Sequence, residues 1–289
     1  KHYGEIAKSI KGDIESLLTY LSTDYPWKTD TTRYSNRSLY EEIIKIISQQ
    51  FSDLARSSVH QNNFENIGFK LIEYVCTHTN ECNFITLNYD ILLENLLCSY
   101  YPCIKFKSEI FGNIYQYPMS NICSRNGRIL IEEEFKGQLP TIIKLHGSVN
   151  WFWAGRTSSD TIYYRTWEWY EENNIDIGLK PYIIPPVMDK NAFYNHIAIH
   201  SLWQQAEQML KEADEIYIIG FSFPQTDLSV KYLFQSALRQ RSDVPIYVIN
   251  PETEQTLRIN YDKVFGQKGS VCYEYTGEDN VMERFIKEH

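Results

Sequence analysis

The chain has 289 residues, 43% of them hydrophobic, so it is long enough to bury the core of one large domain. Its formal net charge of −9 argues against nonspecific binding to nucleic acid or to anionic membrane. No apolar run reaches the ~18 residues of a membrane helix and no signal segment opens the chain, so we expect a cytoplasmic protein without nucleic-acid or membrane partners.

Two amphipathic helices open the predicted order of elements. The first is expected to begin at Ser38, which forms a capping box with Glu41, and its apolar residues recur at helical spacing. The second helix carries apolar residues on one side from Phe64 to Val75. The early part of the chain is therefore predicted to be helical.

Apolar strands and amphipathic helices then alternate. Asp90 and Asp227 are expected to cap two of these helices. This alternation indicates an α/β fold, and we predict a Rossmann-like doubly wound parallel sheet that is covered on both faces. The predicted order is strand 82–87, helix 90–100, strand 141–151, helix 201–214, strand 215–220, helix 227–240, strand 245–250 and helix 252–261.

The stretch from about 101 to 195 departs from this alternation. It is rich in aromatic residues between 151 and 170, which serve either as the core of a subdomain or as a subunit interface. We predict a single domain over 1–289 with a small inserted subdomain at 151–200.

Polar residues follow four of the predicted strands. In an open α/β sheet, ligands bind outside the carboxyl ends of the strands, where helix N-termini point outward. If the strands are parallel, one cleft collects these residues. The residues are Asn88 and Asp90 after the first strand, His146, Gly147 and Ser148 after the second, Gly220, Phe221 and Ser222 after the third, and Asn250 after the fourth.

Each of these residues also has a local structural explanation. Asn88 and Asp90 suit a turn and a helix cap, and Gly-Ser after a strand suits a tight turn. His146 stands at a strand terminus, where its ordinary pKa suits a general base near neutral pH, although a buried core histidine is the alternative. Both interpretations stay open on the sequence alone.

Other enzyme and metal templates fit poorly. The stretch "GFSFP" has Pro224 where a nucleophile elbow needs its second glycine, and neither a phosphate-binding loop nor G-x-G-x-x-G is present. The six cysteines lack the C-x2-C spacing of a zinc site, and His196 and His200 stand at i, i+4 without a third ligand. We therefore expect no metal.

Four motifs in order resemble the sirtuin-like NAD-consuming domains, in particular their bacterial antiphage-defence branch. They are "TLNYD" at 86–90, "LHGS" at 145–148, "IIGFSFPQTD" at 218–227 and "VIN" at 248–250. The resemblance implies NAD as a substrate and a catalytic set of His146, Asn88 and Asp90, with His146 as general base. It also implies NAD-binding positions at Thr86, Gly147, Gly220, Phe221, Ser222, Asp227 and Asn250, although Asp227 has a helix cap as its alternative role.

Two departures from that family refine the expectation. The stretch from Trp151 to His200 lacks the four zinc cysteines of deacylating sirtuins, so hydrolysis of NAD to nicotinamide and ADP-ribose is expected rather than deacylation of peptides. The glycine-rich loop of relatives is expected upstream of Lys1. The resemblance further implies a homo-oligomer that is activated by a protein partner or a fused sensor domain. The alternatives are a non-catalytic sensor of NAD or ADP-ribose and an NAD-dependent protein deacylase or ADP-ribosyltransferase.

Overall fold

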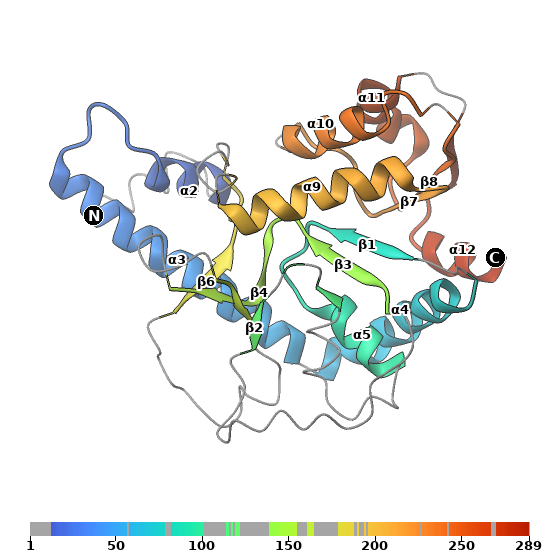
Figure 1. Ribbon diagram of the computed structural model, residues 1–289, viewed down its shortest axis with the longest axis horizontal. Helices are drawn as coiled ribbons and strands as arrows, with labels where there is room; N and C mark the ends of the chain where they lie inside the picture. Colours follow the sequence, from blue (N-terminus) through green and yellow to red (C-terminus); the bar gives the residue numbers. More distant parts are fainter. Residues whose placement is uncertain are drawn as a thin grey trace. The chain divides into compact units, whose positions relative to one another are not determined.

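Eight α-helices and a set of short strands make up the described part of the chain (Figure 1). The mixed α/β class predicted from the sequence is confirmed. The structure is a computed structural model that describes residues 13–56, 58–78, 82–100, 114–115, 117, 119–121, 139–154, 161–164, 179–187, 190, 194, 196–225, 227–241, 243–266 and 270–288.

The chain divides into two units, each with its own hydrophobic cluster. The first unit contains Lys1–Gln61 and Phe84–Ser201, and the second contains Asn62–Asn83 and Leu202–His289. The predicted subdomain at 151–200 is described only in part and stays a prediction. The buried clusters are Leu18, Ile44, Ile183 and Val187 in the first unit, and Ile249, Tyr275, Val281 and Phe285 in the second.

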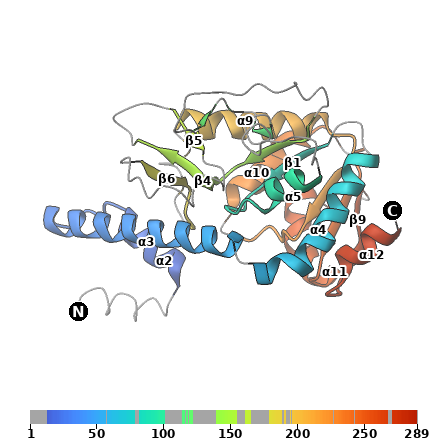
Figure 2. The same cartoon turned by 90° about the horizontal axis from the view of Figure 1, so that it is seen from below.

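Two helices open the described part of the first unit. Helix α2 (Ile14–Ser22) lies against the long helix α3 (Asp30–Arg56), as Figure 2 shows. The prediction that the helix containing Ser38 begins at that residue is wrong, because α3 begins at Asp30. Thr29 Oγ1 accepts a hydrogen bond from Thr32 N at 3.2 Å at this earlier start. The added turns are mostly polar and exposed, so they carry no apolar periodicity that would reveal them in the sequence.

The described strands of the first unit form two sheets. In one, β1 (Asn83–Thr86) pairs with β3 (Thr141–Lys144), and helix α5 (Leu92–Tyr100) follows β1. Leu145 N, just after β3, donates to the carbonyl of Thr86 at the end of β1, so the carboxyl ends of the two strands lie together. The other sheet has the order β2 (Ser120–Asn121), β5 (Tyr163–Tyr164), β4 (Gly147–Trp153) and β6 (Lys180–Ile183).

The predicted strand at 141–151, whose end was expected at His146, Gly147 and Ser148, is divided into two strands in the structure. The chain turns at Leu145 and His146, and Gly147 begins the separate strand β4, which pairs antiparallel with β5 and β6. Two aromatic residues near the end of β4 belong to the core, because Trp151 is fully buried and Phe152 is nearly so, whereas Trp153 is half-buried. Trp167, Trp169 and Tyr170 lie outside the described residues.

The second unit is built on a three-stranded parallel sheet of order β7-β8-β9. Tyr74 of α4 and Phe285 of α12 pack on one face of it, and α10 and α11 lie on the opposite face from α12 (Figure 1). The predicted parallel sheet with helices on both faces is thus confirmed for these strands, while the complete Rossmann-like arrangement stays a prediction. The elements are α4 (Ser58–His78), α9 (Ile197–Glu212), β7 (Ile216–Ile219), α10 (Leu228–Ala237), β8 (Ile246–Asn250), α11 (Glu254–Phe265), β9 (Val271–Thr276) and α12 (Val281–Glu288); α4 and α9 each begin in the first unit.

Within the described ranges, no helix combines the length and the apolar character that crossing a membrane requires.

Candidate functional site

The turn after β1 carries Asn88 and Asp90 and begins α5. Thr86 Oγ1 accepts a hydrogen bond from Asn88 N at 3.1 Å, and Asp90 Oδ1 accepts one from Leu92 N at 3.0 Å. Asp90 therefore satisfies a free amide at the helix start, as its position in the sequence predicted. The side chain of Asn88 is exposed, whereas that of Asp90 is half-buried.

The turn between β3 and β4 lies beside this first turn. Besides the bond from Leu145 N to Thr86 O at 3.0 Å, Val149 N donates to Tyr89 O at 2.9 Å. The ring of His146 lies 6.4 Å from the ring of Tyr89, centroid to centroid. The structure thus brings the predicted residues Asn88, Asp90 and His146 into one neighbourhood of the first unit.

His146 is held firmly in that neighbourhood. Its side chain is only 5% exposed, and its carbonyl accepts a hydrogen bond from Ile184 N at 2.8 Å. Tyr89 reaches the same segment, because its hydroxyl donates to Ile184 O at 2.6 Å. Tyr89 is a residue that sequence reasoning missed, and it packs against the buried cluster of Leu18, Ile44, Ile183 and Val187.

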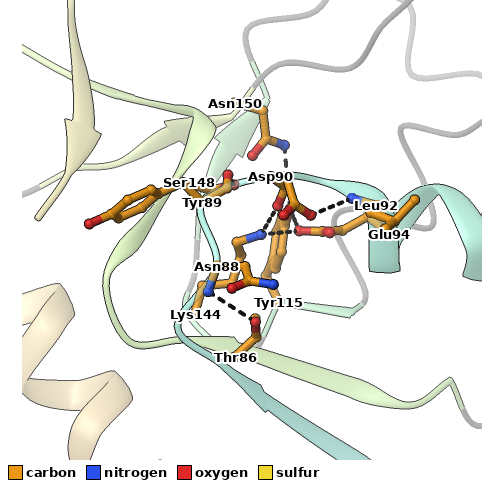
Figure 3. Close-up of polar contacts among 10 residues, drawn as sticks. All are labelled: Thr86, Asn88, Tyr89, Asp90, Leu92, Glu94, Tyr115, Lys144, Ser148 and Asn150. Atoms are coloured by element: carbon orange, nitrogen blue, oxygen red, sulfur yellow. Dashed lines mark hydrogen bonds and ion pairs between the residues drawn. The ribbon is translucent and has the colours of Figure 1, made fainter. Parts of the chain in front are cut away.

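A buried ion pair lies directly beneath the first turn (Figure 3). Lys144 of β3 and Glu94 of α5 have side chains that are 1% and 0% exposed, and Lys144 Nζ lies 2.9 Å from Glu94 Oε1. The same ammonium donates to the carbonyl oxygen of Asp90. A charge that loses its hydration in this way is stable only when it is paired and hydrogen-bonded.

Two further polar side chains complete this buried network. The hydroxyl of Tyr115 donates to Glu94 Oε1 at 2.8 Å, and Asn150 Nδ2 donates to that hydroxyl at 3.3 Å. Burial, followed by the negative charge of Glu94, raises the pKa of Tyr115 well above its ordinary value. The phenol therefore stays protonated and serves as a hydrogen-bond donor.

The sequence contains a signal for this network that lies outside the predicted site residues. Lys144 stands inside the apolar run "TIIKLHG", and Glu94 stands inside "DILLENLL". A charged residue on a face that must be buried requires an opposite charge nearby, so each of these two residues predicts a partner.

Gly147 has a structural reason to be glycine. Its φ is +75°, and a Cβ built there would lie 2.2 Å from the backbone oxygen of Tyr182 on β6. Any side chain would collide with a peptide group of the neighbouring strand. The glycine in "LHGS" is thus explained by the pairing of β4 with β6, independently of any ligand.

In the second unit, the ends of β7 and β8 lie side by side. Gly220 N donates to Ile249 O at 2.9 Å, which places Gly220 next to Asn250. Asn250 is buried, and its Oδ1 accepts from Glu252 N at 2.9 Å. Helix α11 holds the segment after β7, since Tyr261 donates to Phe221 O at 2.6 Å and Asn260 donates to Ser222 O at 3.1 Å.

The prediction that Asp227 caps α10 is wrong in its chemistry. Asp227 does stand at the N-cap position, but its side chain makes no capping hydrogen bond. Its φ and ψ of −105° and 53° differ from the extended conformation from which an N-cap side chain reaches back to the first free amides.

The pair His196 and His200 has a structural role at its first member. His196 Nδ1 accepts from Ala198 N at 3.3 Å, at the start of α9, and its ring lies 4.9 Å from that of Tyr182. Across the residues that the structure describes, no group of three His, Cys, Asp or Glu side chains is arranged to hold a metal ion.

The predicted site residues thus form two groups. The first unit gathers Asn88, Asp90 and His146, and the second gathers Gly220 and Asn250; a single cleft that includes both groups stays a prediction. Comparison with known proteins assigns no family: no family model matches the chain, and no curated protein matches it in sequence. The resemblance to sirtuin-like domains therefore rests on the four motifs.

Proposed function

We propose that the protein is an NAD glycohydrolase, which cleaves NAD to nicotinamide and ADP-ribose. The observation that supports this proposal is the contact between the Asn88–Asp90 turn and the His146 turn in the first unit. An amide, a carboxylate and an imidazole near one another are the groups that this reaction needs.

The proposed chemistry is a displacement at C1 of the nicotinamide ribose. The carbon–nitrogen bond to nicotinamide breaks, its electron pair returns to the pyridine ring, and positive charge develops on the sugar. The carboxylate of Asp90 and the oriented amide of Asn88 stabilise that charge. Water supplies a hydroxyl group to C1 and a proton to His146, so that the products are nicotinamide and ADP-ribose.

The proposed reaction requires different degrees of access to Asn88 and to His146. Asn88 is exposed and can meet a ligand in the described conformation. His146 is 5% exposed, so its ring must become accessible when NAD binds. The antiphage-defence role, and activation by assembly or by a partner, follow from the motif resemblance alone and belong to the same proposal.

The burial of His146 also favours a second candidate function. If the ring stays packed against Tyr89, and if Asp90 serves only as a helix cap, the same neighbourhood binds NAD or ADP-ribose without cleaving it. A non-catalytic sensor of this kind needs the exposed amide of Asn88 for contact but no general base.

The decisive experiment measures nicotinamide release from NAD by the full-length protein over a range of protein concentrations. We expect His146→Ala to lower the rate by at least about a hundredfold, as is typical for loss of a general base, and Asn88→Ala to lower it by about a hundredfold through loss of an oriented dipole. His200→Ala, which alters an exposed histidine of α9, is the matched control and should match the wild type. Equal release by wild type and His146→Ala would exclude the proposed reaction, whereas calorimetric binding of NAD without turnover would establish the sensor.

A further inference from the structure

We infer that Lys144, with its charge neutralised by Glu94, is the positioning residue that holds the Asn88–Asp90 turn beside the His146 turn. This role rests on the proposed function as far as catalysis is concerned. Neither residue belongs to the motif positions to which the resemblance assigns a role. The side-chain ammonium of Lys144 contacts the turn at the main-chain carbonyl of Asp90, so Lys144 acts through Asp90 rather than on a substrate.

The first argument comes from burial. All four residues of β3 are buried, and the side chain of Lys144 is 1% exposed. A lysine in such a strand is costly unless its ammonium finds both a counter-charge and hydrogen-bond acceptors. Glu94, 0% exposed, supplies the counter-charge at 2.9 Å, and the carbonyl of Asp90 supplies the other acceptor.

The second argument comes from the direction of the contacts. The carbonyl of Tyr89 accepts from Val149 N at 2.9 Å and from Ser148 Oγ at 3.2 Å, both on β4. The next carbonyl, that of Asp90, accepts from Lys144 on β3 (Figure 3). Two successive carbonyls of the turn are therefore fixed by the two strands that flank His146, which sets the position of the turn relative to that residue.

The third argument comes from the support of the carboxylate. Glu94 lies one helical turn after Asp90, on the helix whose first amide Asp90 caps. Tyr115 donates to the same Glu94 oxygen that Lys144 contacts, and Asn150 donates to Tyr115. The ammonium is thus held by Glu94 of α5 and by the carbonyl of Asp90, and the Glu94 carboxylate is in turn held by Tyr115, which Asn150 of β4 supports.

The test removes the ion pair without leaving a lone buried charge. In the full chain, Lys144→Met and Glu94→Leu are combined, because an apolar pair of similar volume keeps a buried site folded. The matched control combines Lys180→Met and Glu41→Leu. That pair has a similar nitrogen–oxygen distance of 2.8 Å, lies in the same unit and has side chains that are 52% and 43% exposed.

Two readouts separate a positioning role from a merely structural one. Hydrogen exchange of the amides at 88–92, which include that of Leu92, should become about ten- to a hundredfold faster in the buried double variant, the factor carried by one hydrogen bond to a charged group. Nicotinamide release should fall by a similar factor in kcat, with a smaller change in KM. The control variant should match the wild type in both readouts.

The outcomes are distinguishable. If the folded double variant exchanges the amides at 88–92 as slowly as the wild type, Lys144 does not hold the turn and the inference is overturned. If exchange accelerates but nicotinamide release is unchanged, the turn is held but its position is irrelevant to catalysis, which also overturns the inference. If the wild type releases no nicotinamide, the proposed function fails, and the exchange experiment still decides whether Lys144 holds the turn.

Discussion

Replacing Gly147 with alanine tests the structural explanation of the "LHGS" motif. The substituted residue would keep a φ of +75°, which costs an L-residue about 1–2 kcal/mol. Its Cβ would also lie 2.2 Å from Tyr182 O. Because carbon and oxygen atoms approach no closer than about 3.3 Å in favourable contacts, β4 and β6 would have to separate by roughly 1 Å.

The second cost arises because the obstacle is a peptide group of a paired strand rather than a flexible side chain. Overpacking of this kind costs about 1–3 kcal/mol, so the total loss in the free energy of unfolding is about 2–5 kcal/mol. Gly266→Ala is the control, because Gly266 has a φ of +68° and no atom lies within 4 Å of the position that a Cβ would take there. The control should lose only the conformational part, about 1–2 kcal/mol.

The assay is urea unfolding followed by circular dichroism, together with hydrogen exchange of the Ile184 amide, which donates to His146 O at 2.8 Å. Gly147→Ala should destabilise the protein more than Gly266→Ala, and only Gly147→Ala should speed exchange at Ile184. Equal losses in both variants, with Ile184 exchange unchanged, would refute the steric argument. A ligand-based reason for the glycine would then be preferred.

Three further predictions concern charged residues of the first unit. The hydrogen bond from Lys180 is the main cause that lowers the pKa of Glu41 in the folded protein. Ionised Glu41 therefore stabilises the fold at pH values above its unfolded pKa of about 4.3, and this stabilisation is lost as the pH falls through the folded pKa. Glu41→Gln should therefore make urea unfolding less sensitive to pH below about 4. Asp90→Ala should cost about 1 kcal/mol in thermal or urea unfolding through loss of the cap, and Asp90→Asn should restore most of it. Lys144→Met alone should lower the free energy of unfolding in urea by about 3–5 kcal/mol, because it leaves the buried carboxylate of Glu94 without its counter-charge. Lys180→Met should lower it by under about 1 kcal/mol, because that ion pair is exposed.

The turn residues show how far local sequence reasoning reaches. Asp90 accepts a hydrogen bond from the first amide of α5, as predicted, because a short polar side chain after a strand satisfies free helix amides through contacts between residues close in sequence. The alternation of apolar strands and amphipathic helices likewise indicated the parallel sheet of β7 and β8, since side-chain periodicity is set within each element. The candidate residues Asn88 and His146 were found because both follow such strands.

Other features depended on contacts between distant parts of the chain. His146, Gly147 and Ser148 marked the end of the strand that begins at Thr141, but the sequence did not show that a second strand begins at Gly147, where β4 pairs with Ile183 of β6. The start of α3 at Asp30 was missed for a different reason, since the first turns of this helix are polar and exposed and have no apolar period to read.

The α/β class, the order of most elements and the polar turns on which the proposed site is built could all be predicted from local patterns of residues. The folded chain was needed to show that Lys144 contacts Glu94, 50 residues away, and that its ammonium donates to the carbonyl of Asp90. A charged residue within an apolar run requires a partner once it is buried, but the run itself does not identify that partner. The partner is set by the packing of β3 against α5.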